Sequence, residues 1–242
     1  MILLRLATTE RLVRPASAAE NREPIIWRSS SYNSMSVTLD TPEGTLVIAN
    51  AYLPPNVDSK PKIREAAASQ HAELQTHLAR HTYAVAGFDG NETITANGRI
   101  QVRLNGDHTL SGNTKNTSLS ASTMGCYATT MVDCHRAVHG KGPRPYPTMA
   151  DMTNTMSGKP SDGIKTIHSK IDYTLCSASL AARISCYTID HSPREWAEAT
   201  RSNYHAALIT CLDWSSLWAT PADGNPGDQP KVQGHKLDAY PN

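Results

Sequence analysis

The stretch TLVIANAYLPPN (residues 45–56), a helical pattern after it, and then YAVAGFDGN (residues 83–91) decide the fold. Both quoted segments are apolar runs of strand length that end in polar side chains. Pro54 and Pro55 end the first run, because proline cannot donate a hydrogen bond to a sheet. A helix between two strands predicts a sheet with a helix packed on one face.

Residues 61–81 carry the clearest helical pattern. Pro61 suits a first helical position, and apolar side chains from Ile63 to Leu78 recur on one face. Upstream, residues 36–39 and 45–52 predict two strands joined by a hairpin turn. Further apolar runs predict strands at 83–88, 171–176, 183–189 and 206–214, and a short helix is expected within 127–138.

The remaining segments show little apolar pattern. Residues 1–31 have no clear periodicity. Residues 90–122 are rich in Asn, Thr, Ser and Gly, and residues 139–163 in Pro and Gly, so both are predicted to be long loops. We expect one domain over residues 1–218 and a flexible tail or linker over 219–242.

The charge of the chain limits its partners. Its 242 residues carry a net charge of +1, which does not suit bulk electrostatic binding of nucleic acid. Any such contact has to be local, and Arg99, Arg103 and the run 139–144 are the candidates. A solvated basic loop is the competing interpretation of each.

The cysteines and the amino terminus bear on the compartment. The five cysteines are an odd number, without a C-x-x-C pair or zinc spacing, and Cys176, Cys186 and Cys211 are predicted to be free buried thiols. The apolar start is too short for a signal sequence, and no run approaches about 18 apolar residues. We therefore expect an intracellular protein, cytoplasmic or nuclear, that contacts no membrane.

Four short motifs place polar side chains at strand ends: Tyr52, the pair Asp89 and Asn91, Asp172, and His205. Phosphodiester hydrolysis needs a base for a water molecule, donors to the phosphoryl oxygens and help for the leaving oxygen. Asp89 and Asn91 are two residues apart, so in extended chain they face the same way. An aspartate in an apolar strand, as Asp172 is, needs a polar partner. The structural alternatives are packing for Tyr52, a turn at Asp89 and a structural histidine at 205.

The order and spacing of these motifs resemble the endonuclease/exonuclease/phosphatase superfamily, which includes deoxyribonuclease I and the abasic-site endonucleases. They are most similar to the endonuclease domains of non-LTR retrotransposons, over residues 36–214. The resemblance implies a four-layer α/β sandwich and DNA cleavage that depends on Mg²⁺ or Mn²⁺. It also implies that Asp172 orients a catalytic His205, that Tyr52 reaches a phosphate oxygen, and that Asp89 and Asn91 serve the water and the phosphoryl oxygen.

The chain departs from the family pattern at several points. Gly90 stands between Asp89 and Asn91 and is expected to loosen that segment, and Tyr204 stands where the family has an aspartate. The glutamate that usually binds the metal is not found, because no glutamate near the amino terminus (Glu10, Glu20, Glu23) follows a matching strand. Asp89 is left as the metal-ligand candidate, and we expect the N-terminal strands of the fold to be partly missing.

These departures leave competing hypotheses. The first is a metal-dependent DNA endonuclease. The second is a catalytically impaired remnant that at most binds a partner or nucleic acid. A third keeps the fold and takes a phospholipid or inositol phosphate, although no apolar membrane-binding loop supports it. Asn56 and His135 are further candidates, for which holding a loop and supporting the fold are the structural alternatives. The oligomeric state has no signal in the sequence.

Overall fold

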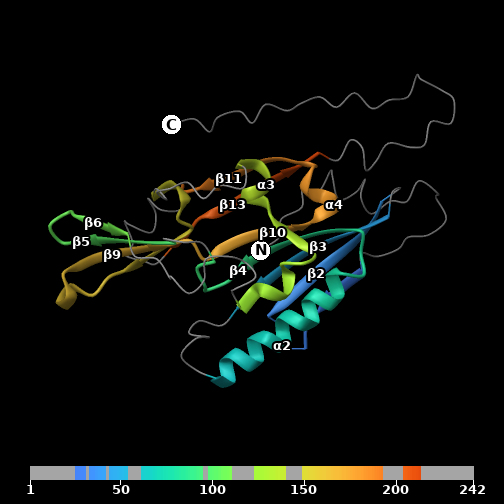
Figure 1. Ribbon diagram of the computed structural model, residues 1–242, viewed down its shortest axis with the longest axis horizontal. Helices are drawn as coiled ribbons and strands as arrows, with labels where there is room; N and C mark the ends of the chain where they lie inside the picture. Colours follow the sequence, from blue (N-terminus) through green and yellow to red (C-terminus); the bar gives the residue numbers. More distant parts are fainter. Residues whose placement is uncertain are drawn as a thin grey trace.

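Three β-sheets make up most of the structure. The computed structural model describes residues 25–30, 33–41, 44–53, 61–94, 98–110, 123–139, 149–192 and 204–213. Its sheets have the strand orders β1-β2-β3-β4-β10-β7, β11-β13 and β12-β8-β9-β5-β6 (Figure 1). The chain is therefore of the mixed α/β class, as predicted.

The six-stranded sheet is the centre of the molecule. Its strands are β1 (Ile25–Arg28), β2 (Ser34–Thr41), β3 (Gly44–Tyr52), β4 (Tyr83–Asp89), β10 (Asp172–Ser177) and β7 (Met131–Asp133). Strands β3 and β4 are parallel, and helix α2 (Pro61–Leu78) connects them, while all other neighbours in the sheet are antiparallel. The strand–helix–strand prediction is confirmed, but β1 falls in a segment that showed no periodicity.

Helix α2 covers one face of this sheet (Figure 1). It buries Ala67, Leu74 and Leu78 against apolar side chains of β3 and β4, including Val47 and Phe88. The helix ends at Leu78 rather than at residue 81. Burial of an apolar stripe of this kind supplies most of the stability of a helix in a folded domain.

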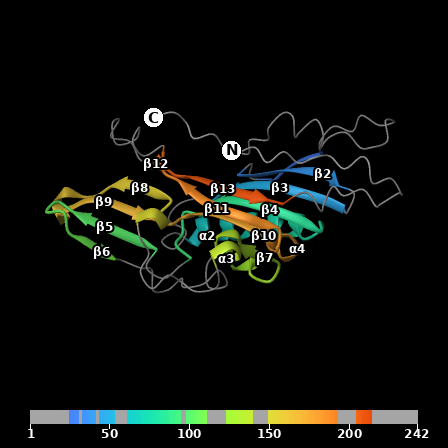
Figure 2. The ribbon, with the colours of Figure 1, turned by 90° about the horizontal axis from the view of Figure 1, so that it is seen from above.

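The opposite face packs on the two-stranded sheet of β11 (Ile184–Asp190) and β13 (Ala207–Leu212). The short helices α3 (Cys134–His139) and α4 (Ala178–Ala181) lie beside it (Figure 2). Helix, six-stranded sheet and two-stranded sheet thus form successive layers. The fourth layer of the expected sandwich stays a prediction.

The prediction of free thiols is wrong for two of the cysteines. Cys186 on β11 and Cys211 on β13 are register partners, with Cα atoms 5.0 Å apart, and form a disulfide. The pairing depends on the register of two strands, which their separation of 25 residues did not reveal. Cys126, Cys134 and Cys176 are free, and Cys176 is buried as predicted.

The five-stranded sheet arises mostly from segments predicted to be loops. It contains β12 (Tyr204–His205), β8 (Asn154–Ser157), β9 (Ile164–Ser169), β5 (Arg99–Arg103) and β6 (His108–Leu110). Both views show β5, β6 and β9 extending away from the six-stranded sheet (Figures 1 and 2). Arg99–Arg103 alternates polar and apolar residues, as a half-buried strand does, but its polar surroundings hid the signal. Three short 3-10 helices complete the described chain, at Thr123–Tyr127, Met149–Asp151 and Pro160–Asp162.

Several sequence predictions lie outside the described residues. They are Pro54, Pro55 and Asn56, the three N-terminal glutamates, and the tail 219–242. Within the described part of the chain, no helix has the length and apolar character needed to cross a membrane.

Candidate active site

Three predicted site residues lie in one row across the six-stranded sheet. Tyr52 on β3 is the register partner of Asp89 on β4, and Asp89 is the partner of Asp172 on β10. Register partners point to the same face of a sheet, so the three side chains share one face. The Leu53 N–H donates to the carbonyl of Asp89, which fixes the ends of β3 and β4 against each other.

His205 reaches this row from the five-stranded sheet. Its Nδ1 lies 3.1 Å from both carboxylate oxygens of Asp172. Asp172 is 8% exposed, whereas the side chain of His205 is 44% exposed. The hydrogen bond to Asp172 raises the pKa of His205 above its usual 6.5, against the opposing effect of burial. The predicted partnership of a buried aspartate and an imidazole is therefore present.

Asp89 completes a compact group. One ligand-type atom from each of Asp89, Asp172 and His205 lies within 4.8 Å of the other two. Burial raises the pKa of Asp89, and the neighbouring negative charge of Asp172 raises it further. His205 and a hydrogen bond from the Asn91 backbone N–H, 3.2 Å from Oδ1, oppose this rise. Two carboxylates in one half-buried place repel each other, and a cation between them relieves that repulsion.

The segment after β4 is more tightly held than the sequence suggested. The N–H of Gly90 donates to the carbonyl of Ile171 over 2.8 Å. A Cβ atom at residue 90 would lie 3.1 Å from that carbonyl and from Met124 Sδ, so a larger residue would have to displace these neighbours slightly. The expected loosening by Gly90 is therefore wrong. Asn91 then takes a left-handed backbone conformation with φ of 47°, which asparagine tolerates better than most residues.

The other predicted residues contribute less. Asn91 Nδ2 donates to the carbonyl of Leu53 over 2.6 Å, so part of its amide is used within the protein. Tyr52 is 44% exposed at the edge of the group. His135 lies on α3 and is not part of the group. Burial, followed by the charge of Lys170, lowers the pKa of His135 to about 4, and its backbone N–H donates to Asp133.

Two residues of the site were not predicted. Asn154 is 4% exposed, and its Nδ2 lies 2.9 Å from His205 Nε2, on the ring edge opposite Asp172. Thr153 is fully buried, and its Oγ1 accepts the backbone N–H groups of Ile171 and Asp172, each over 3.0 Å. Both lie in the segment predicted to be a loop. An Asn-Thr pair in a polar segment has no signature that would have identified them.

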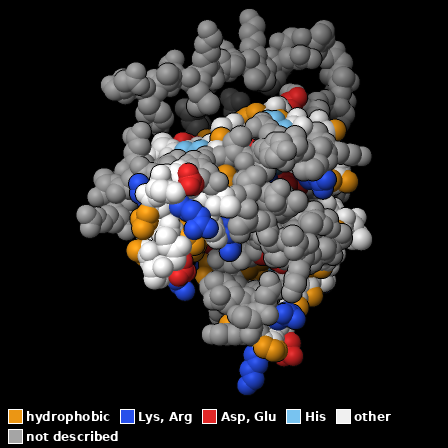
Figure 3. Space-filling model, turned by 60° about the vertical axis from the view of Figure 1, so that its left-hand side comes forward, with side chains coloured by type: hydrophobic (Ala, Val, Ile, Leu, Met, Phe, Trp, Pro, Cys, Tyr) orange, Lys and Arg blue, Asp and Glu red, His pale blue; other side chains and the backbone are white. Residues whose placement is uncertain are grey.

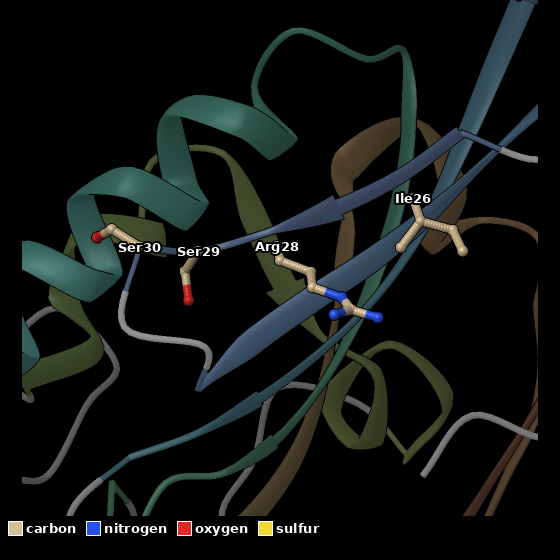
Figure 4. A pocket seen from close by; sticks show the side chains of 4 residues that line it. All are labelled: Ile26, Arg28, Ser29 and Ser30. Atoms are coloured by element: carbon tan, nitrogen blue, oxygen red, sulfur yellow. The ribbon is translucent and has the colours of Figure 1, made fainter.

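A surface hollow among the described residues lies away from this group. It has a volume of about 580 Å³ and is lined along β1 by Ile26, Arg28, Ser29 and Ser30 (Figure 4). This lining holds no carboxylate or imidazole, so it offers neither an acid–base pair nor a metal ligand. Among the described residues, the carboxylates and imidazole that could bind a metal ion or transfer a proton come together at Asp89, Asp172 and His205.

Comparisons with known proteins address the fold. No family model and no curated protein sequence match the chain. The 3′ phosphatase NExo from Neisseria, solved with a product DNA hairpin, matches with a TM-score of 0.50 and 15% identity over 80% of this chain and 73% of its own. An AP endonuclease from Archaeoglobus fulgidus matches with a TM-score of 0.50 and 16% identity, over 80% of this chain and 72% of its own. The endonuclease domain of TRAS1, a telomere-specific non-LTR retrotransposon, matches with a TM-score of 0.47 and 14% identity, over 78% of this chain and 68% of its own.

At these identities the likeness concerns the fold. The chain has the fold of the AP endonuclease and exonuclease/phosphatase structures, and the resemblance first inferred from four short motifs is confirmed at that level.

Proposed function

We propose that this chain hydrolyses phosphodiester bonds of DNA with the help of a divalent cation, as an endonuclease of the retrotransposon type. The observation that carries the proposal is the group of Asp89, Asp172 and His205 within 4.8 Å, in which Asp172 accepts from His205 Nδ1. The motif pattern motivates the choice of DNA and of the retrotransposon type, and the shared fold is compatible with both.

His205 and Asp172 form the acid–base half of the proposed mechanism. Asp172 accepts a hydrogen bond from the Nδ1–H of His205. Nε2 is therefore the ring nitrogen that can take up or release a proton in the reaction. In the present structure Asn154 donates to that nitrogen, and the substrate has to replace this contact. A partly protonated imidazole also places positive charge beside the phosphoryl oxygens.

Asp89 forms the metal half. One oxygen of the Asp89 carboxylate accepts from the Asn91 N–H, and the carboxylate faces that of Asp172. Two neighbouring carboxylates suit a hard cation such as Mg²⁺ or Mn²⁺. Both oxygens of Asp172 already contact His205, so Asp89 is the principal ligand. A bound cation supplies charge neutralisation at the phosphoryl oxygens. Tyr52, exposed at the edge of the group, can donate its hydroxyl to a phosphate oxygen.

A specific observation favours a second function, nucleic-acid binding without cleavage. Among the described residues no glutamate joins the acidic group. Tyr204 stands where the resemblance implies an aspartate, and its hydroxyl lies 2.8 Å from Nδ1 of His191 rather than in the group. The two functions differ in whether Asp89 alone can hold the cation.

Nicking of supercoiled plasmid by the purified chain tests the proposal. We expect nicking with Mg²⁺, none with a chelator, and a loss of about 10²–10⁴-fold in His205→Ala, the usual scale for an acid–base group. His81→Ala is the matched control, because His81 is a histidine outside the group whose ring forms a side-chain hydrogen bond with Thr45. Binding of Mn²⁺, followed by its electron paramagnetic resonance signal, is expected to weaken in Asp89→Asn. A folded chain that neither nicks DNA nor binds Mn²⁺ would exclude the hydrolase and leave the binding function.

A further inference from the structure

The strand register connects His205 to an arginine on the far side of the five-stranded sheet. His205 on β12 pairs with Asn154 on β8, Asn154 pairs with Ser169 on β9, and Ser169 pairs with Arg99 on β5. These four residues form one row, so their side chains lie on the same face of the sheet. Three strand spacings of about 4.8 Å place Arg99 about 14 Å from His205 along the row.

The ends of this row are exposed and its middle is buried. Asn154 and Ser169 are 4% and 3% exposed, while His205 and Arg99 face solvent. Arg103 lies four residues beyond Arg99 on β5, on the same face, and is also exposed. A ligand bound at His205 can therefore extend to the arginines across the part of the sheet in which the polar residues Asn154 and Ser169 are buried.

Nothing in the described chain neutralises these arginines. Neither Arg99 nor Arg103 has a carboxylate partner among the described residues. The strands and turns around them carry four cationic side chains against two carboxylates, namely Arg99, Arg103, Lys159 and Lys165 against Asp107 and Asp162. Figure 3 brings this end of the molecule forward and shows Lys and Arg side chains on it, with Asp and Glu side chains among them. This local excess of two positive charges compares with a net charge of +1 for the whole chain.

We propose that this face of the five-stranded sheet binds the sugar–phosphate backbone of nucleic acid through Arg99 and Arg103, with the bond to be cut at His205. The proposal rests on the proposed function for the position of the cut and deepens it by naming where the flanking strand lies. A span of about 14 Å is several times the 3.4 Å rise per nucleotide along the duplex axis. Arg99 thus contacts a phosphate a few nucleotides from the cut, and Arg103, four residues along β5, contacts a second phosphate beside it.

The arrangement explains how a nearly neutral protein binds a polyanion. Arginine is suited to phosphate because its planar fork of N–H donors matches two phosphate oxygens. Contacts of this kind fix the register of the strand and carry no base preference. We therefore expect Arg99 and Arg103 to set affinity and salt dependence, while His205 and Asp172 set the rate of cleavage.

The test is the salt dependence of binding to a fluorescent 30-base-pair duplex, measured by anisotropy between 50 and 200 mM NaCl with a chelator present. Each lost phosphate contact lowers the slope of log affinity against log salt by about 0.9 for duplex DNA. We expect this loss in Arg99→Ala and again in Arg103→Ala, and a restored slope in Arg99→Lys. Lys62→Ala is the matched control, because Lys62 is an exposed cation on α2, outside this face.

The outcomes separate this proposal from the hydrolase. Wild-type slopes in both arginine variants, an equal loss in Lys62→Ala, or an absence of duplex binding would each overturn the proposal. His205→Ala is expected to lose nicking and to keep duplex binding, with the part of the slope that depends on the arginines unchanged. If the duplex binds through Arg99 but is never nicked, the surface stands and the hydrolase fails.

Discussion

Replacing Asp172 by asparagine separates the chemistry of the site from its folding. The substitution removes one negative charge and keeps the shape of a side chain that is 12% exposed. Both oxygens of Asp172 lie 3.1 Å from His205 Nδ1, and an asparagine at this position can still accept from that nitrogen through one oxygen. The variant therefore keeps the contact and loses its charge.

The expected cost in stability is small. A hydrogen bond to a charged group contributes about 1.5–3 kcal/mol and a neutral one about 0.5–1.5 kcal/mol, a difference of about 1 kcal/mol. The His205 side chain is 44% exposed, so solvent screening reduces the difference further. We expect Asp172→Asn to change the free energy of unfolding by less than about 1 kcal/mol. Nicking is expected to fall about 10²-fold or more, because the imidazole loses its charged partner.

The same variant should change how stability depends on pH. The folded protein raises the pKa of both His205 and Asp89, and Asp172 is a cause of each rise. A group with a raised pKa stabilises the fold below its unfolded pKa and loses that contribution as pH rises through the folded value. The losses begin near pH 6.5 for His205 and near pH 3.8 for Asp89. Asp172→Asn lowers both pKa values and therefore flattens the decline of stability in both windows.

Urea unfolding at a series of pH values between 3 and 9, beside plasmid nicking, measures these effects. An unfolded variant would show that Asp172 is needed for the fold and would remove the basis of the argument. A folded variant that nicks within threefold of the wild type would show that Asp172 does not serve the imidazole in catalysis. An unchanged pH dependence would contradict the assigned cause of the raised pKa values.

Two further predictions concern residues that support the site. Burial lowers the pKa of His71 to about 4, so the contribution of His71 to the free energy of unfolding is present above pH 6.5 and is lost as pH falls toward 4. His71→Gln can keep a hydrogen bond to Tyr127. In urea unfolding, it should reduce the loss of stability in acid by up to about 3 kcal/mol. Thr153→Val leaves the N–H groups of Ile171 and Asp172 without their buried acceptor and should cost about 2–4 kcal/mol, whereas Thr153→Ser should cost far less; equal losses in the two variants would show that the hydroxyl is not the cause.

The sequence predicted those site residues whose position in or after an apolar strand is visible locally. Asp172 in an apolar strand needed a polar partner, and the structure supplies His205 at 3.1 Å. Asp89 came at the end of an apolar run, and the register with Asp172 shows why it belongs to the same row. The prediction for Asp172 rested on the cost of burying a charge without a partner, and that for Asp89 on its spacing from Asn91 after the strand.

The sequence did not predict the parts that depend on sheet assembly. Asn154 reaches His205 only because β8 pairs with β12, and these strands are about 50 residues apart in a polar stretch. Cys186 and Cys211 meet for a similar reason. Gly90 was interpreted as a source of freedom, whereas its backbone N–H is bonded to Ile171, and Ile171 and Met124 pack tightly around it. Strand register and close approach are tertiary properties, which composition and periodicity do not encode.

The two halves of the site differ in how complete they are. His205 is held on both ring nitrogens, by Asp172 and by Asn154, so its orientation is set before any ligand arrives. Asp89 faces a carboxylate whose oxygens are both taken by the imidazole. Asp89, with one oxygen bonded to the Asn91 N–H, would therefore be the main carboxylate that the protein offers to a cation here. Mg²⁺ is commonly held by one or two carboxylates together with phosphate oxygens of the substrate. Under the proposed function, the cation would therefore bind together with the nucleic acid, whose phosphate oxygens would supply the remaining ligands.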